Sequence, residues 1–326
     1  MDNEKDWIKA GQIVAEVREY AKTIIKDGTP LVEATELIEK KITSLGGKPG
    51  FPPDLSINDI AAHYSCLTNE KTIFKKGDLV KIDLGVHING AIADTAATIC
   101  VDSNENKELI EASRKALDEA IKLIRPGLRV NEIGKVVTEV IEGYGFNSIK
   151  NLSGHGIDLF KIHTKPSIPN YDNRSNEVLL DNKVIAIEPF ASTGVGLVIE
   201  GKSSEVYGVI NKKPTRSPIV REVLKYIEDE FKTMPFAKRW IVKKFGPGKA
   251  QIALTTLERE NILYQYPILL EKNQGLVSQT EHSILVREKP ILLTKMATIW
   301  KLLRYLHGMI FGLVFAGFVF MMYYLY

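Results

Sequence analysis

Two aspartates stand on either side of a predicted hairpin turn, where they could bind metal ions together. Asn89-Gly90 separates two apolar-rich runs, which is a strong signal for a two-residue β-hairpin turn. With these residues in the turn, Gly85 pairs with Asp94, and Asp83 faces the same side of the sheet as Asp94. The carboxylates are then diagonal neighbours, with Cβ atoms roughly 7 Å apart or less. Such like charges repel, and either divalent cations or protonation of one carboxyl would remove the repulsion.

Three further residues could complete a metal site with the two aspartates. His155 is flanked by glycines outside any helical pattern, and Glu188 follows the buried-type strand 184–187. Glu281 is in the middle of a predicted strand over residues 276–286. One imidazole and four carboxylates suit borderline-to-hard divalent ions such as Mn, Fe, Co or Zn. The alternatives are a turn residue for His155 and salt-bridge partners for the two glutamates.

The elements that position these residues are predicted to come from a duplicated half-domain. Apolar spacing predicts a helix that ends before Gly28, and a second helix that starts at Thr29-Pro30 and ends at Gly46-Gly47. The same pattern returns 99 residues later, up to Gly145. We expect two halves of helices followed by antiparallel strands, with a site between them. Chance similarity of two helical hairpins is the alternative.

Composition sets the broad class of the protein. The 326 residues allow one large domain or two modest ones, with the apolar and charged fractions of an ordinary globular protein. The net charge of +3 includes Lys301 and Arg304 near the C-terminus, so nothing in the remaining chain demands a polyanionic partner. Two cysteines indicate a reducing compartment rather than a disulfide framework. The amphipathic N-terminal segment predicts no signal peptide.

Several motifs in series resemble those of methionine aminopeptidases, in order and in spacing, from about residue 4 to 295. They are Ala61-Ala62-His63-Tyr64-Ser65, Lys81-Ile82-Asp83, Ala93-Asp94-Thr95, Ser153-Gly154-His155, His163, Ile187-Glu188-Pro189-Phe190 and Gln279-Thr280-Glu281-His282. The resemblance implies an α/β (α+β) pita-bread fold of the creatinase/aminopeptidase type, with pseudo-twofold symmetry. One departure is Cys66, where the family more often has proline.

The same resemblance implies a dinuclear metal centre. Its ligands would be Asp83, Asp94, His155, Glu188 and Glu281, with Asp94 and Glu281 bridging two divalent ions. The metal could be Co, Mn, Fe, Zn or Ni. In such a centre a metal-activated hydroxide would attack the first peptide carbonyl, as in other two-metal aminopeptidases.

The implied reaction is removal of the N-terminal methionine from nascent proteins, preferentially before a small second residue. Glu188 is the expected proton acceptor, and His63 and His163 would hydrogen-bond the scissile carbonyl and amide. Phe51, Ile162, His163 and Tyr266 would line the pocket for the methionine side chain, with His63 also contacting substrate.

The long segment between Glu188 and Glu281 predicts an insert over about residues 200–270. Helices are expected at 218–231, 237–245 and 249–258, followed by an apolar stretch at 262–270. The insert resembles that of type 2 methionine aminopeptidases and also a winged helix. Its basic residues allow a DNA-binding interpretation, but interleaved acids favour a solvated basic face, so no specific nucleic acid is expected.

Residues 296–326 depart from the family and are expected to form a tail beyond a catalytic domain of residues 1–295. Tyr305 to Tyr326 contains no charged residue and is about long enough to span a bilayer as a helix. Lys301 and Arg304 precede it, which favours a cytoplasmic protein tethered to the membrane by a transmembrane helix. Fusion of two reading frames is the alternative.

Two other functions share this fold. One is a peptidase with another substrate, such as a proline-specific peptidase, which the insert and the pair Phe51 and Tyr266 argue against. The other is a non-catalytic binding module, such as a ribosome-associated one, in which ligands would be expected to be lost. All five are present here. Methionyl peptides are thus the expected partners, with the ribosome as a further one.

Overall fold

The hairpin that carries both aspartates has the predicted register. The computed structural model describes residues 3–296. In it, β4 (Leu79–Ile88) and β5 (Ala91–Cys100) pair antiparallel, with Gly85 opposite Asp94. Asn89 and Gly90 form the turn with φ values of 50° and 91°, as a two-residue turn of mirror-image type requires. The local sequence signal therefore places the two aspartates correctly.

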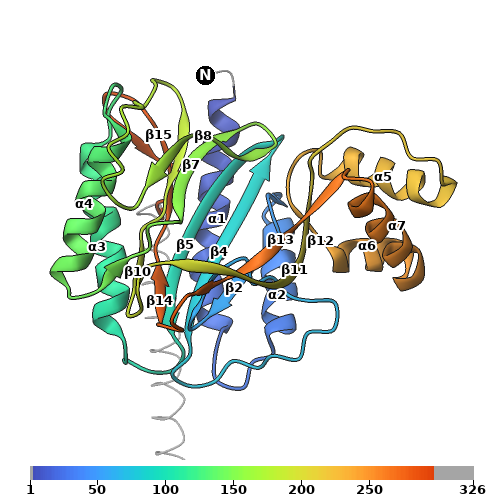
Figure 1. The fold of residues 1–326 in the computed structure, drawn as a ribbon, viewed down its shortest axis with the longest axis horizontal. Coiled ribbons are helices and arrows are strands. Elements are labelled where there is room, and N and C mark those ends of the chain that lie inside the picture. The colour runs from blue at the N-terminus through green and yellow to red at the C-terminus, as the bar shows by residue number, and fades with distance from the viewer. Residues whose placement is uncertain (1–2, 297–326) are drawn as a thin grey trace, which may run out of the picture. The chain divides into compact units, whose positions relative to one another are not determined.

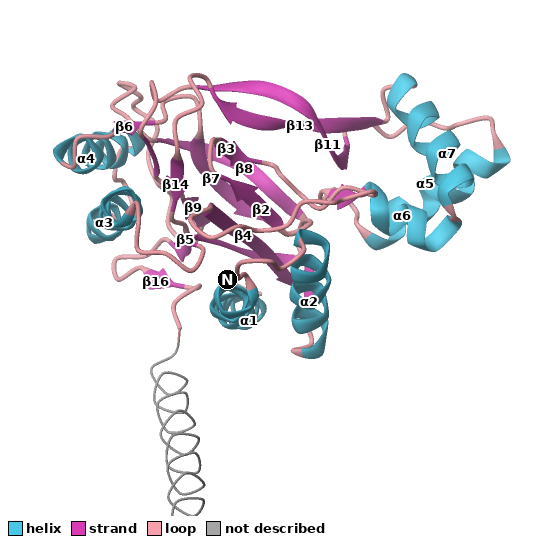
Figure 2. Ribbon diagram, turned by 90° about the horizontal axis from the view of Figure 1, so that it is seen from below, coloured by secondary structure: helices cyan, strands magenta, loops and turns pink. Residues whose placement is uncertain are grey.

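Two pairs of helices confirm the predicted duplication. In the first half α1 (Glu4–Ile24) is followed by α2 (Leu31–Ser44), and in the second α3 (Lys107–Leu123) is followed by α4 (Val130–Gly143). α4 begins and ends 99 residues after α2. Figures 1 and 2 show α1 and α2 beside β4 and β5, and α3 and α4 beside the strands of the second half. Each pair buries its apolar stripe in a separate hydrophobic cluster.

The duplication extends from the helices to the strands. A bridge joins Pro30 to Ile73 just before α2, and an equivalent bridge joins Arg129 to Val178 just before α4. Ten residues after Ile73 the chain reaches Asp83, and ten residues after Val178 it reaches Glu188. The two carboxylates therefore occupy corresponding positions in the two halves.

The strands of the second half are interrupted where their carboxylates lie. β9 (Val184–Ile187) pairs with β15 (His282–Leu285), and β10 (Phe190–Ser192) pairs with β14 (Val277–Gln279). The gap between β14 and β15 contains Glu281, so the prediction of one continuous strand over 276–286 is wrong. The backbone of Glu281 instead pairs with Ala96 of β5, which joins the two halves.

The predicted insert lies on a hairpin of long strands, β11 (Val198–Val209) and β13 (Leu263–Glu271). Its helices are α5 (Pro218–Glu230), α6 (Lys238–Phe245) and α7 (Pro247–Arg259), close to the predicted bounds. They share a hydrophobic cluster of their own. Several of the basic side chains are paired: Lys238 contacts Glu205 and Arg239 contacts Glu39.

The remaining strands complete four antiparallel sheets among the described residues. They are β1 (Lys48–Pro49), β2 (Asp54–Ile57), β3 (Ile60–Ala62), β6 (Asn147–Ser148), β7 (Ser153–Asp158), β8 (Lys161–Pro169), β12 (Phe236–Ala237) and β16 (Ile291–Leu292). The sheet orders are β1-β4-β2 with β5 on β4, β14-β10-β6, β12-β11-β13-β3 and β16-β15-β9-β7-β8.

The prediction of a transmembrane helix is not supported. Within residues 3–296, no helix is both long and apolar enough to cross a membrane. α1 has 21 residues, but it carries charged side chains along its length, including Glu4, Lys9 and Glu16. The run from Tyr305 to Tyr326 to which the prediction was assigned lies outside the described residues.

The predicted start of α2 is also wrong by one position. The Thr29 hydroxyl donates to the Ile24 carbonyl oxygen and accepts from the Lys26 amide, so it closes the end of α1. Pro30 precedes the first helical residue, Leu31, and no side chain caps α2.

The hairpin turn should tolerate no side chain at Gly90. A Cβ there would lie 2.3–2.6 Å from ring carbons of Phe160, in addition to the cost of a positive φ. We expect Gly90→Ala to lower the free energy of unfolding by about 2–5 kcal/mol. Gly28→Ala is the matched control, since its φ of 82° is similar but nothing lies within 4 Å; it should cost about 1–2 kcal/mol. Equal losses in urea unfolding would contradict the packing argument.

Candidate metal centre

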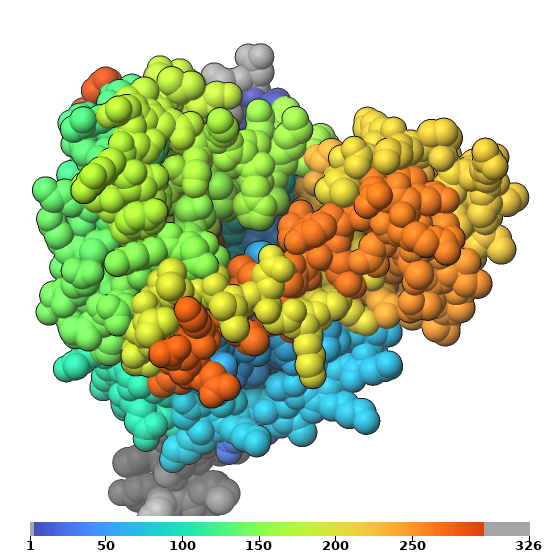
Figure 3. Space-filling model, viewed as in Figure 1, coloured from blue at the N-terminus to red at the C-terminus, as the bar shows by residue number. Residues whose placement is uncertain are grey.

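A cavity of about 570 Å³ lies between the two halves and the β11–β13 hairpin. Figure 3 shows the surface hollowed where the green, yellow, orange and blue parts of the chain meet. All ten residues predicted to act at the site line this cavity. They are Phe51, His63, Asp83, Asp94, His155, Ile162, His163, Glu188, Tyr266 and Glu281.

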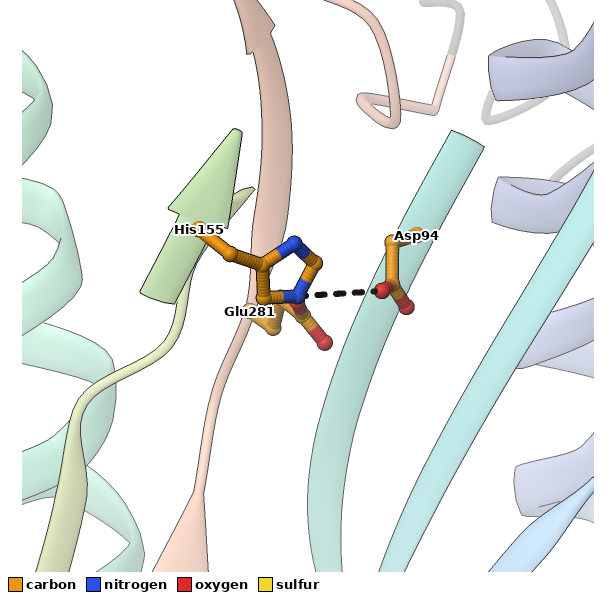
Figure 4. A group of neighbouring side chains, drawn as sticks. All are labelled: Asp94, His155 and Glu281. Atoms are coloured by element: carbon orange, nitrogen blue, oxygen red, sulfur yellow. Dashed lines mark ion pairs between the residues drawn. The ribbon is translucent and has the colours of Figure 1, made fainter. Parts of the chain in front are cut away.

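Four carboxylates enter the cavity from different segments of the chain. Asp83 lies on β4 and Asp94 on β5, while Glu188 and Glu281 lie in the two strand interruptions of the second half. Asp94, His155 and Glu281 point toward one another (Figure 4), with ligand atoms all within 4.8 Å. These three are buried, and Asp83 and Glu188 are half-buried.

Several oxygens of this cluster have no hydrogen-bond donor. Asp83 Oδ1, Asp94 Oδ1 and Glu281 Oε1 are buried without a partner among the described residues. An unpaired buried carboxylate oxygen is costly. Hard oxygen donors that converge from two strands and two strand interruptions are suited to divalent cations, so the residues present fit a metal site.

Burial and mutual repulsion shift the carboxyls toward their protonated forms. Burial is the main cause that raises the pKa of all four well above the ordinary value. The negative charge of a neighbour raises it further: Asp94 acts on Asp83 and on Glu281, and Glu188 acts on Asp94. Without a cation, protons therefore take over the role of neutralising the cluster.

His155 is held in the tautomer that a metal ligand requires. Its Nδ1 lies 3.2 Å from the Gly156 carbonyl oxygen, which can only accept, so Nδ1 carries the hydrogen. Burial lowers the pKa of His155 to about 4, so the ring is neutral. Nε2 lies 3.7 Å from Asp94 Oδ2 and 3.6 Å from Glu188 Oε1. Ligand atoms that share one ion at about 2.0–2.2 Å each lie at similar separations.

Gln279 orients two of the carboxylates, a role that the sequence motif did not reveal. Its amide nitrogen donates to Asp83 Oδ2 at 3.0 Å and to Glu188 Oε2 at 3.3 Å. These bonds leave Glu188 Oε1 facing His155 and Asp83 Oδ1 without a hydrogen-bond donor among the described residues. The signal that the sequence offered was an amide side chain two residues before the motif carboxylate Glu281.

Asp54 is a second residue of the cavity wall that the sequence did not single out. It lies on β2 opposite Asp83, only 6% exposed. Polar and apolar residues alternate through Asp54, Leu55, Ser56 and Ile57, which is typical of a strand with one face in water. Here the polar face is buried as well, because the Asp54 and Ser56 side chains accept hydrogen bonds from the His63 and Tyr64 amides.

An apolar surface borders the acidic cluster. The Phe51 ring lies over Gly85, where any Cβ would meet ring atoms at 2.2–2.4 Å. Ile162 and Tyr266 line the same cavity. The cavity thus combines a charged end with an apolar end.

Two further histidines lie between these ends. His163 contacts His155 edge-on, with ring centroids 4.5 Å apart. Desolvation inside the cavity, and then the neighbouring His155 and His63, lower the pKa of His163 to about 3. The His63 ring contacts Tyr266, and its Nδ1 lies 3.2 Å from the Pro267 carbonyl oxygen. Nδ1 therefore carries a hydrogen in His63.

The sequence matches the profile of metallopeptidase family M24 over residues 6–236. The chain belongs to this family. Named relatives share nearly half of their residues with it over 295 aligned residues. The methionine aminopeptidase of Thermococcus onnurineus is 45% identical over 295 residues, which cover 90% of this chain and 100% of that protein. The methionine aminopeptidase of Pyrococcus horikoshii is 46% identical over 295 residues, covering 90% and 99%.

Solved structures confirm the M24 pita-bread fold. A thermophilic Arx1 superposes with a TM-score of 0.79 at 17% identity, covering 90% of this chain and 91% of that chain. The methionine aminopeptidase of Thermotoga maritima superposes with a TM-score of 0.65 at 24% identity, covering 89% and 96%. At these identities the likeness concerns the fold alone.

These comparisons confirm the resemblance to archaeal methionine aminopeptidases, and the chain is a metal-dependent hydrolase of family M24. The expectation of divalent metal ions is likewise confirmed by the family and by the cluster of Asp94, His155 and Glu281. The identity of the metal stays open.

Metal binding should release protons, because the carboxyls of the metal-free cluster have raised pKa values. A raised carboxyl pKa means that stability of the metal-free fold is lost as pH rises through the folded-state pKa. We expect calorimetric titrations with Mn²⁺ near pH 6.5 to show net proton release. The number of protons released is obtained by comparing the heats in buffers of different ionisation enthalpy. His155 contributes none there because it is already neutral.

The matched variants for this titration are Glu281→Gln and Asp102→Asn. The first removes a titrating group of the cluster and should reduce proton release. The second changes an exposed carboxyl whose pKa is lowered by the Asp27 backbone amide, and should leave proton release unchanged. Heats that do not depend on the buffer would show that the carboxyls are already ionised.

Proposed function

We propose that this protein removes the N-terminal methionine from polypeptides, preferentially when the second residue is small. The observation that carries the proposal is one cavity that joins an acidic cluster with unpartnered oxygens to an apolar pocket. The relatives named methionine aminopeptidase support it. Residues 1–295 are the proposed catalytic domain, and each of those relatives aligns with 295 residues of this chain over nearly its own whole length.

The residues that would hold two divalent ions are Asp83, Asp94, His155, Glu188 and Glu281. Bound ions would supply Lewis acidity, which polarises a carbonyl and makes a water nucleophilic near neutral pH. Gln279 keeps Asp83 and Glu188 in fixed orientations by its two hydrogen bonds. The neutral His155 presents Nε2 toward Asp94 and Glu188.

The proton transfers are assigned to Glu188. Its Oε1 faces His155 and its Oε2 accepts from Gln279, so the carboxylate lies at the edge of the cluster beside the cavity. Glu188 would accept a proton from the attacking water and pass it to the leaving amine. One carboxylate thereby acts first as base and then as acid.

The two cavity histidines would bind the scissile peptide. With Nδ1–H donated to Pro267, His63 offers Nε2 as acceptor for the scissile amide N–H. His163 would donate to the carbonyl oxygen as negative charge develops there. Two different contacts fix the peptide plane relative to Glu188.

The apolar end of the cavity would bind the methionine side chain. Phe51, Ile162 and Tyr266 form its wall beside His163. An unbranched thioether fills such a pocket better than a β-branched or charged side chain. Cytoplasmic location and contact with the ribosome stay predictions from the sequence.

The proposal is tested with peptides that differ only in their first residue. Metal-free protein should be inactive, and Mn²⁺, Fe²⁺ or Co²⁺ should restore cleavage of Met-Ala-Ser. Leu-Ala-Ser and Pro-Ala-Ser should be cleaved at least about 100-fold more slowly. Neither a branched leucine side chain nor a proline ring fits a pocket shaped for an unbranched thioether. Equal rates on the three peptides would contradict the proposed specificity.

Replacing His63 distinguishes a role in binding the scissile peptide from a role as a metal ligand. His63→Ala should lower kcat by roughly two to three orders of magnitude, as for loss of one group that contacts the transition state. Its metal content should stay normal, because the His63 ring hydrogen-bonds to the Pro267 carbonyl oxygen and packs against Tyr266 rather than contacting the cluster. Glu281→Ala, in contrast, should lose metal in elemental analysis. Loss of metal from the His63 variant would make His63 a ligand.

A further inference from the structure

His63 has an unusual backbone conformation. Its φ is 65°, in the left-handed region that non-glycine residues rarely adopt. Such a residue keeps this conformation only where its surroundings hold it. The contacts of the His63 backbone therefore bear on where its ring lies.

A single buried carboxylate makes these contacts. Asp54 accepts a close hydrogen bond from the His63 amide at Oδ2. At Oδ1 it accepts from the Tyr64 amide at 3.2 Å and from the Ser56 hydroxyl at 2.6 Å. Both oxygens of Asp54 are thus occupied by donors, two of which belong to the segment at His63.

Neighbouring backbone bonds hold the same segment against β2. The Leu55 amide donates to the Tyr64 carbonyl oxygen at 3.0 Å, and the Ser65 hydroxyl donates to the Pro53 carbonyl oxygen at 2.8 Å. They fix the position of the segment, and Asp54 fixes the peptide orientation at His63. The ring is held separately by Pro267 on β13.

We propose that Asp54 is a positioning residue for the reaction, which holds His63 in the left-handed conformation that directs its ring into the cavity. This inference rests on the proposed role of His63 in peptide cleavage. The carboxylate is suited to the task because it accepts on both sides. An amide accepts only at its oxygen, so its NH₂ group would face a donor of the His63–Tyr64 segment.

Asp54 could instead act on the metal cluster, because it lies opposite Asp83 on β4. The two roles differ in what they change. A positioning role acts through His63 and leaves metal content unaltered, whereas a role at the cluster acts without His63 and alters metal affinity.

The test compares Asp54→Leu, Asp54→Asn and the control Asp59→Asn. Asp54→Leu should lower kcat for Met-Ala-Ser about 10- to 100-fold, as for a misplaced reacting group, with KM changed less than about threefold and metal content normal. Asp54→Asn, which keeps one acceptor and the side-chain shape, should lose about 3- to 10-fold. Asp59→Asn makes the same chemical change at a partly exposed position and should match the unaltered protein.

A double-mutant cycle identifies the route of the effect. In a His63→Ala background, adding Asp54→Leu should lower kcat by less than about twofold, because the group that it positions is already gone. Full additivity of the two losses, or loss of metal from the Asp54 variants, would overturn the proposal. If Asp54→Leu does not fold, Asp54→Asn takes its place in the cycle.

A measurement without turnover keeps this test independent of the proposed function. In metal-free protein labelled with ¹⁵N-histidine, the His63 ring signals are identified by their absence in His63→Ala. They should indicate hydrogen at Nδ1 in the unaltered protein and should shift or broaden in Asp54→Asn. Unchanged signals would overturn the positioning role, whereas inactivity of the unaltered protein on methionyl peptides would overturn only the proposed function.

Discussion

Repulsion among four carboxylates in one cavity is the constraint on which the rest of this structure depends. Within the described residues, none of Asp83, Asp94, Glu188 and Glu281 forms an ion pair with a lysine or arginine. Lys81 lies only two residues from Asp83, but its ammonium donates to the Asn58 carbonyl oxygen at 2.7 Å. Burial lowers the pKa of Lys81 to about 7, so the ammonium loses its proton near neutral pH. The chain leaves neutralisation of the cluster to protons or metal ions.

Backbone hydrogen bonds join the two halves at Asp94 and Glu281. Where β14 gives way to β15, Glu281 leaves the second-half sheet, and both its amide and its carbonyl pair with Ala96. The Asp94 amide donates to the Ser283 hydroxyl at 2.8 Å, and that hydroxyl donates back to the Asp94 carbonyl oxygen at 2.9 Å. The seam between the two halves is therefore hydrogen-bonded at the residues that carry the charges. At Glu281 the interrupted strand thus directs a side chain into the cavity while its backbone amide and carbonyl stay hydrogen-bonded.

The sequence predicts local features such as turns and helix starts well, but it predicts poorly where a strand exchanges one neighbouring strand for another. Asn89-Gly90 determines the hairpin register through two positive φ angles, and Ser217-Pro218 determines the start of α5. The Glu281 strand was expected to be continuous because apolar periodicity does not register a strand that exchanges one neighbour for another. The sequence does not identify Asp54 as a site residue for a related reason. Alternation predicts which residues share a face of a strand, but tertiary packing decides whether that face is exposed to water. The ligand set came from the family resemblance, since spacing alone left protonation and salt bridges open.

The insert contributes to the cavity through the strands from which it extends. Glu205 of β11 accepts from the amide and the hydroxyl of Thr68, in the loop that follows the His63 segment, and from Lys238 of α6. β13 contributes Tyr266 to the cavity wall and the Pro267 carbonyl that bonds the His63 ring. One end of the His63 segment is thus fixed by the first half through Asp54, and the loop beyond it is fixed to the insert strands. The acidic cluster is built by the two halves alone, whereas the apolar end of the cavity also contains Tyr266 from the insert strand β13. A change in the insert can therefore alter substrate binding while it leaves the metal ligands in place.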